Sequence, residues 1–199
     1  TIIASRFLLS FGKLTAPLLL QSPDSLGVAW RNWTHSVPGL FGANPPWLGL
    51  MAFGSTLTFG QPEWFATVLV LGGCLIAGAC GYFSLRHLTK SRWQAAVLAS
   101  LWGLALPLSG ATGAGSLDAI AAAILLPLIA NVCRVWLVND KAGPQMWRRP
   151  AHFALLSTIL ISFVPLTWLV LALVAFLIGK RTKNWKAALI AALGPIVVL

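Results

Sequence analysis

The feature that most constrains this chain is the length of its uncharged apolar runs. Residues 63–85 read EWFATVLVLGGCLIAGACGYFSL, and no charged side chain lies between Glu63 and Arg86. A helix needs about 20 consecutive apolar residues to cross the hydrocarbon core of a bilayer. Only 9% of the 199 residues are charged, and a soluble domain cannot cover its surface with so few. The sequence therefore indicates an integral membrane protein and excludes a soluble enzyme core.

We expect an all-α fold, a polytopic bundle of transmembrane helices. The pattern predicts an outer-face loop with a re-entrant segment at 21–62, followed by three continuous spans at 63–85, 93–109 and 116–138. A broken helical hairpin at 152–178 and a truncated last span at 187–199 complete the prediction. Within the first of these, we expect a short helix at 25–35 and an apolar element at 46–60 that is too short to cross. The chain begins without Met and stops inside an apolar run. We therefore expect residues 1–199 to be a single membrane domain, part of a longer chain.

Basic residues indicate which side of the membrane each loop faces. The chain has 14 Lys and Arg against 4 Asp and Glu, a net charge of +10. In a soluble protein this balance would suggest nucleic acid, but membrane proteins place Lys and Arg in cytoplasmic loops, near anionic headgroups. We therefore expect a multi-pass protein of the plasma (inner) membrane without a nucleic-acid partner. Loops 86–92 and 139–150 are predicted to be cytoplasmic, and 21–62 and 110–117 to lie on the outer side.

The apolar run at 152–178 conflicts with this rule unless it turns back. A single span there would place four positive charges outside, on Lys180, Arg181, Lys183 and Lys186. Pro165 interrupts the run, and proline breaks a helix because it lacks an N–H and its ring clashes with the preceding turn. We favour two half-helices that meet at 163–167 and return the chain to the cytoplasm. A straight span is the alternative, because the charge rule has exceptions.

Two acidic residues on the expected outer side, Asp24 and Asp118, are candidate catalytic residues. Asp118 begins a span after the glycine-rich run Gly110–Gly115, where the helix macrodipole favours an acid and Ser116 is a capping residue. The functional alternative is a contact with a metal, a sugar or a phosphate at the membrane surface. Backbone amides of the glycine-rich run would suit an anion, but we favour a tight turn between packed helices as the use of the run.

A second group on the outer side combines Asp24 with Arg31 and His35. Such a set suits acid–base chemistry beside a phosphate-binding guanidinium, and the alternative is a solvated, capped loop helix. Trp30 and Trp33 are candidate substrate-binding residues, because indole rings stack on sugars. A belt of Trp at the membrane interface is the alternative reading of these two side chains.

Three arginines at the expected cytoplasmic side, Arg134, Arg148 and Arg149, are predicted to contact lipid headgroups. Arg134 would reach the interface from within its span by extending its long side chain. The three cysteines lie in apolar runs without CxxC spacing, and no cluster has metal-ligand spacing. We therefore expect buried thiols and no metal site within these residues.

Several blocks of the sequence together resemble a known family. They are DSLGVAWRNW at 24–33, PPWLGLMAFGSTLTFGQPEW at 45–64, YFSLRHLTKSRW at 82–93, LPLSGATGAGSLDAIAAAILLPLIA at 106–130 and FVPLTWLVLALV at 163–174. Over residues 24–178 the chain is similar to the polytopic membrane region of the large actinobacterial family 2 glycosyltransferases of cell-envelope biosynthesis. It departs from that pattern at Gly115-Ser116-Leu117-Asp118, where an arginine is expected in the turn.

The resemblance implies an amino-terminal cytoplasmic transferase domain outside this chain, with a DxD-type site for a divalent metal. This segment would be the membrane domain, and its partners would be the lipid bilayer, other parts of the same long chain, and a polyprenyl-phosphate lipid or glycan acceptor. The expected reaction moves a sugar from a nucleotide- or polyprenyl-phosphate-linked donor to a lipid-linked or glycan acceptor. The alternatives are a transporter or flippase-like module for a lipid-linked sugar, or a non-catalytic membrane scaffold subunit.

Overall fold

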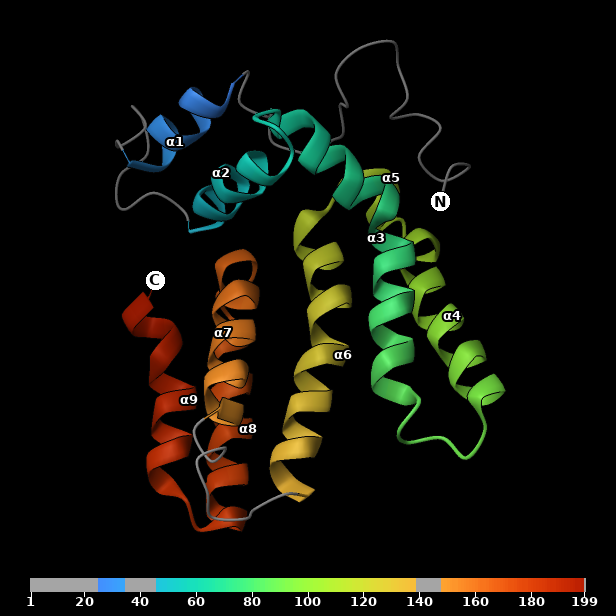
Figure 1. Ribbon diagram of the computed structural model, residues 1–199, viewed down its shortest axis with the longest axis vertical. Helices are drawn as coiled ribbons and strands as arrows, with labels where there is room; N and C mark the ends of the chain where they lie inside the picture. Colours follow the sequence, from blue (N-terminus) through green and yellow to red (C-terminus); the bar gives the residue numbers. More distant parts are fainter. Residues whose placement is uncertain (1–24, 35–45, 139–147, 199) are drawn as a thin grey trace. The chain divides into compact units, whose positions relative to one another are not determined.

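The computed structural model describes residues 25–34, 46–138 and 148–198, and within these ranges every regular element is an α-helix. Figure 1 shows the helices in chain order: α1 (Leu26–Thr34), α2 (Trp47–Leu57), α3 (Pro62–Leu85), α4 (Arg92–Leu108), α5 (Ala111–Ala114), α6 (Leu117–Val138), α7 (Arg148–Phe163), α8 (Thr167–Thr182) and α9 (Trp185–Val198). The all-α prediction is confirmed for these residues.

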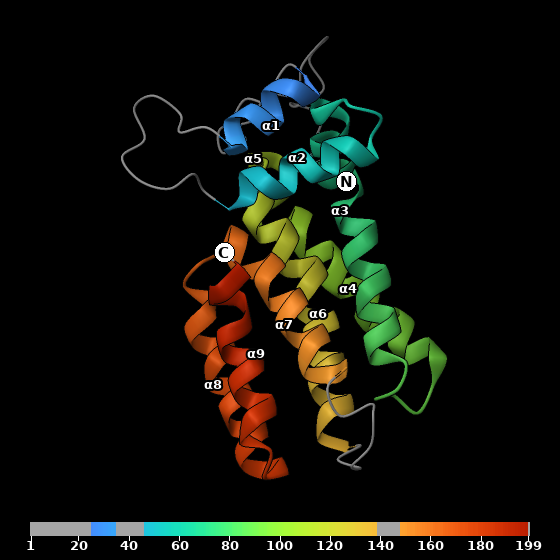
Figure 2. The same ribbon diagram turned by 60° about the vertical axis from the view of Figure 1, so that its left-hand side comes forward.

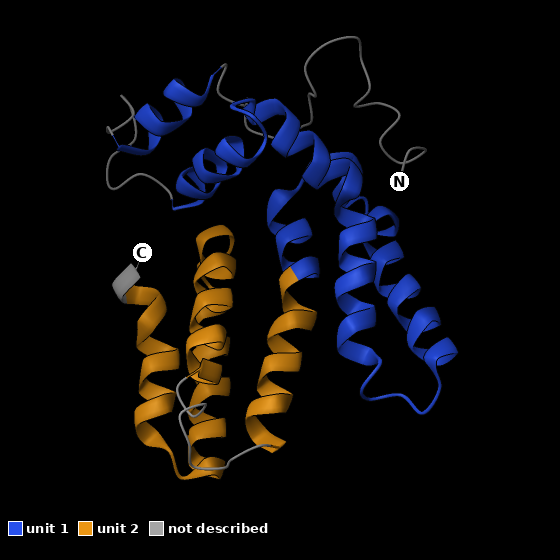
Figure 3. Ribbon diagram, in the orientation of Figure 1, with its two compact units in different colours: residues 1–124 blue, residues 125–199 orange. Residues whose placement is uncertain are grey.

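The chain divides into two compact units within α6, residues 1–124 and 125–199 (Figure 3). Each unit has its own packed interior and is described by itself. The two units differ in which parts of the chain pack together, and this does not decide whether they belong to one membrane domain. The expectation of a single membrane domain over 1–199 stays a prediction.

Helices α3 and α4 form an antiparallel pair in the first unit (Figures 1 and 2). Pro62 occupies the first turn of α3, a position where the missing N–H would have no helical partner. Ser91 caps α4, since its Oγ accepts a hydrogen bond from the backbone N–H of Trp93 at 3.3 Å. These two signals account for where the helices begin.

Small residues allow α3 and α4 to approach closely. Gly103 is buried, and a Cβ added to it would lie 2.6 Å from the carbonyl oxygen of Cys74 and 3.2 Å from the Cα of Gly78. Ala99 is also buried and lies beside Gly78 and Gly81. Close backbone approach through small residues is how helices associate where no water drives them together.

The start of α6 completes the interior of the first unit. Val70 and Ala77 of α3, Leu106 of α4 and Ile120 of α6 form one buried cluster. The indole N–H of Trp102 on α4 donates to the carbonyl of Ala123 on α6 at 2.9 Å. The turn that carries Asp118 is therefore anchored to both neighbouring helices.

Helices α1 and α2 pack on each other, and α2 packs on α3. The ring of Trp33 covers Gly49, where an added Cβ would lie 3.1 Å from three ring atoms. Helix α2 has 11 residues, a length of about 16 Å, which is too short to cross a bilayer. The short elements expected at 25–35 and 46–60 thus contain the helices Leu26–Thr34 and Trp47–Leu57, and the second ends in a turn at 58–60.

The second unit contains α7, α8 and α9, with α9 packed on both of the others (Figure 2). The chain breaks between Phe163 and Thr167, where the N–H of Thr167 donates to the carbonyl of Val164 at 3.0 Å and that of Trp168 to Pro165 at 3.1 Å. The indole N–H of Trp168 also donates to the carbonyl of Ala192 at 3.1 Å. The break lies where Pro165 predicts it, because proline cannot continue the helix.

Two of the described helices, α3 and α6, are long and apolar enough to cross a membrane. Their 24 and 22 residues extend about 36 and 33 Å, against a hydrocarbon core of roughly 30 Å. Helices α4, α7, α8 and α9 have 17, 16, 16 and 14 residues. They extend about 21 to 26 Å. The wider polytopic bundle and the re-entry of the α7–α8 hairpin into a membrane therefore belong to the proposal below.

Candidate functional site

Asp118 lies in the first turn of α6, and its carboxylate is held by the residue that precedes the helix. The hydroxyl of Ser116 donates to Oδ1 of Asp118, while Ser116 itself is buried and Asp118 is exposed. A carboxylate here interacts favourably with the positive end of the helix macrodipole. Ser116 therefore acts here as a hydrogen-bond donor to the carboxylate, which is an exposed anion at the surface of the first unit.

The glycine-rich turn before Asp118 uses its own backbone amides. Gly110 and Gly115 adopt positive φ angles of 78° and 69° on either side of the single-turn helix α5. The N–H groups of Ala114, Gly115 and Ser116 donate to the carbonyls of Gly110, Thr112 and Ala111 at 2.9, 3.2 and 3.0 Å. Amides that are hydrogen-bonded in this way do not point at an anion. These three amides belong to a tight turn between packed helices, and an anion contact of the run stays a prediction.

The predicted group around Arg31 is seen only in part. Arg31 lies in the last turn of α1 and is exposed, whereas Asp24 and His35 lie outside the described residues. Trp30 is 39% exposed and Trp33 packs on α2. No hydrogen bond or ion pair joins Arg31 to Asp118, although the structure describes both residues. The roles assigned to these residues stay predictions.

The three arginines expected at lipid headgroups all belong to the second unit. Arg148 and Arg149 begin α7, and Lys180 and Arg181 lie in the last turn of α8. Because a three-residue turn joins α7 to α8, the start of α7 and the end of α8 lie at the same end of this unit. Positive charge is therefore concentrated at one end of the hairpin, opposite Pro165.

Arg134 lies one turn before the end of α6. Its Nη2 donates to Oδ1 of Asn131 at 3.4 Å, and its Nε is buried without a hydrogen-bond partner in the described part of the chain. Near it, Trp136 of α6 meets Phe153 of α7 edge to face, with ring centroids 6.0 Å apart. The Arg134 side chain is half-buried, and its contact with a lipid headgroup stays a prediction.

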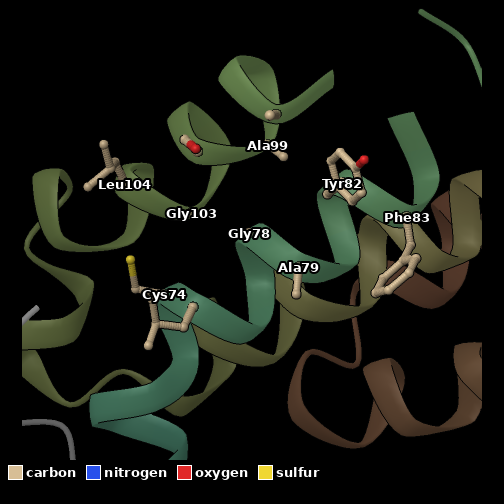
Figure 4. Close-up of a pocket in the computed structure, with 11 residues that line it drawn as sticks. Cys74, Gly78, Ala79, Tyr82, Phe83, Ala99, Gly103 and Leu104 are labelled. Atoms are coloured by element: carbon tan, nitrogen blue, oxygen red, sulfur yellow. The ribbon is translucent and has the colours of Figure 1, made fainter. Parts of the chain in front are cut away.

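An apolar cleft of about 540 Å³ lies between α3 and α4 (Figure 4). Glycine and alanine residues make up much of its lining, and its few polar groups are the Cys74 thiol and the hydroxyls of Tyr82 and Ser100. Figure 4 shows Tyr82 and Phe83 at one end of the cleft and Cys74 and Leu104 at the other. None of the residues predicted from the sequence to bind substrate or lipid lines this cleft.

A signal for the cleft is nevertheless present in the sequence. Ala95, Ala99 and Gly103 are spaced by four residues and share one face of α4, and all three are buried. This face meets the glycines of α3, and the two stripes of small residues contribute to the lining of the cleft. To predict the cleft, one must know that α3 and α4 pair, and the small residues of α4 alone do not show this.

Among the described residues no group of three or more His, Cys, Asp or Glu side chains is placed to hold a metal ion. The fold defines a class of protein: one whose regular elements, in the described ranges, are all α-helices, two of them long and apolar enough to span a membrane. No protein-family model, no curated protein and no solved structure matches the chain. The functional assignment therefore rests on the residues themselves.

Proposed function

We propose that this chain is a polytopic membrane domain, and that it forms the membrane part of an envelope glycosyltransferase. The observation that carries the membrane location is the length of α3 and α6, which exceeds the hydrocarbon core. The transferase assignment is supported by the resemblance of residues 24–178. The two parts of the proposal are therefore tested separately.

Large apolar side chains on the outer faces of several helices support the membrane location. Leu75 on α3 is 73% exposed, Leu101 on α4 is 59% exposed and Val170 on α8 is 63% exposed. Removing apolar surface from water lowers the free energy by about 25 cal/mol per Å², so leaving these side chains in water would be unfavourable. Lipid tails cover such faces without that loss, because they are as apolar as leucine.

The ends of α3 support an orientation across a bilayer. Trp64 lies in its first turn, Tyr82 and Phe83 lie in its last turn, and Arg86 follows at once. Aromatic rings gather at both membrane interfaces, and arginines gather at the cytoplasmic one. In the proposed orientation α3 begins on the outer side and ends in the cytoplasm.

The α7–α8 hairpin supports the same sidedness in the second unit. Its two ends carry Arg148 and Lys180 on one side, so both basic segments can face the cytoplasm. Each helix extends about 24 Å, less than the roughly 30 Å core. We therefore propose that the hairpin enters from the cytoplasmic side and turns at Pro165 within the membrane.

The transferase assignment predicts that the outer-face residues contribute to sugar transfer. In membranes that contain the full-length protein, incorporation of a radiolabelled sugar into lipid and glycan fractions is measured for Asp24→Asn, Arg31→Gln and Asp118→Asn. We expect at least one variant to lose about tenfold, which corresponds to about 1.4 kcal/mol. Glu63→Gln is the matched control, because it removes the same charge in the first turn of α3.

Equal amounts of each variant in the membrane, read by immunoblot, separate a loss of activity from a loss of protein. Full incorporation in all three variants would remove the proposed site and favour a scaffold role. Normal sugar incorporation after the whole segment is deleted would remove the transferase assignment itself. Neither result would bear on the membrane location.

A further inference from the structure

The cleft between α3 and α4 has the length of one membrane leaflet. Its lining on α3 extends from Cys74 to Phe83, a rise of about 13 Å. This is close to half of the roughly 30 Å hydrocarbon core. The end at Phe83 lies next to the end of α3, and the end at Cys74 lies near the middle of the helix. A chain lying in the cleft would therefore extend from the interface to the bilayer midplane.

Positive charge lies at the interfacial end of this cleft. The guanidinium carbon of Arg86 lies 5.3 Å from the centre of the Phe83 ring, which lines the cleft. The Nε–H of Arg86 donates to Nε2 of His87 at 3.1 Å, and its two Nη atoms carry four further N–H donors suited to a phosphate. Lys90 follows in the loop to α4 and Arg92 begins α4, and both are exposed.

We propose that this cleft binds one acyl chain of an anionic phospholipid, with its phosphate held by Arg86. The apolar lining suits a hydrocarbon chain, and the small residues supply the room. The hydroxyl of Tyr82, at the interfacial end (Figure 4), suits the ester region below a headgroup. The cleft ends near the midplane, which favours a leaflet-length acyl chain over a longer polyprenyl chain. The inference rests on the proposed membrane location and is independent of the transferase assignment.

The test is a lipid titration read by native mass spectrometry. The delipidated full-length protein in mild detergent is titrated with phosphatidylglycerol and with phosphatidylcholine that has the same acyl chains. We expect one saturable site that prefers phosphatidylglycerol. Arg86→Gln should weaken that site about fivefold, the effect of about 1 kcal/mol per basic residue near a headgroup. Lys180→Gln removes the same charge from the second unit and should leave the site unchanged.

Two substitutions close the cleft from opposite sides. Ala79 on α3 and Ser100 on α4 both line the cleft and are exposed, so Ala79→Leu and Ser100→Leu should fill it without disturbing the buried contact. Each should weaken phosphatidylglycerol binding by about tenfold or more. Ala105→Leu is the matched control, because Ala105 is exposed on α4 and lies outside the cleft lining.

Equal binding of the two phospholipids would overturn the role of the phosphate and Arg86. Unchanged binding in both leucine variants would overturn the cleft as the site. Tighter binding of a polyprenyl phosphate that is lost in Ala79→Leu would overturn the phospholipid as its occupant. If both leucine variants fail to fold, the comparison of Arg86→Gln with Lys180→Gln still decides the proposal. Sugar incorporation and membrane labelling are read separately, so failure of this inference is distinguishable from failure of the proposed function.

Discussion

Replacing Gly103 by alanine tests how closely α3 and α4 must approach. The new Cβ would lie 2.6 Å from the carbonyl oxygen of Cys74 and 3.2 Å from both the N and the Cα of Gly78. Ordinary van der Waals contact begins at 3.4 Å. The distance from the new Cβ to the Cys74 oxygen is therefore about 0.8 Å too short for such a contact. All three neighbours are backbone atoms, which cannot turn aside as the end of a side chain can. The helices must therefore separate.

Overpacking of this kind typically costs about 1–3 kcal/mol. For a protein of this length, that loss lowers the midpoint of thermal unfolding by about 2–12 °C. Gly81→Ala provides the control at the same helix pair. Its Cβ would lie 3.5 Å from the nearest atom, in the side chain of Trp102, and 3.6 Å from the Cα of Ala99. Both are ordinary contacts, so this variant should melt like the wild type or higher.

The assay is thermal unfolding in one detergent, followed by circular dichroism of the helices. Gly103→Ala should melt well below Gly81→Ala, although both variants add one methyl group to the α3–α4 pair. If the two variants melt together, the close backbone contact at Gly103 is not what limits the approach. The argument from clearance would then be refuted.

Three further predictions concern a hydrogen bond, a backbone angle and the accessibility of the α7–α8 hairpin. Trp102→Phe removes the hydrogen bond to Ala123 and should cost about 0.6 kcal/mol, a typical value between helices in membranes; an unchanged melting midpoint would contradict this. Gly110→Ala should cost about 1 kcal/mol because φ is 78° there, and Gly110→Asn should cost less; equal midpoints would count against the turn geometry. In a cysteine-depleted chain, Lys183→Cys should react with a maleimide applied to the cytoplasmic face, while Leu166→Cys should react from neither face. Labelling of position 166 from outside would show that the hairpin crosses completely.

Much of the helical order follows from local signals in the sequence. The span expected at 63–85 is α3 (Pro62–Leu85), and the one expected at 116–138 is α6 (Leu117–Val138). Pro62 marks the start of α3, and Gly115 with Ser116 marks the start of α6, because these residues suit the ends of helices. The break at Pro165 is equally local.

Features that depend on pairing are not local in this sense. The α3–α4 cleft arises because the small residues on one face of α4 meet glycines on α3. The small residues of one helix do not indicate which other helix they will pack against. The bonds within the glycine-rich turn, such as that from the N–H of Ala114 to the carbonyl of Gly110 at 2.9 Å, likewise depend on the backbone conformation. The sequence shows the glycines and leaves two uses for them.

The central claim, that α3 crosses a membrane, is tested most directly by labelling its two ends. Cys74, Cys80 and Cys133 are replaced by alanine, and single cysteines are placed at Gln61 and Lys90, both of which are exposed. An impermeant maleimide added to intact cells should label the cysteine at 61, and the cysteine at 90 should react only after the membrane is opened. Equal labelling of both positions in intact cells, or protein released from membranes by alkaline carbonate, would contradict the account.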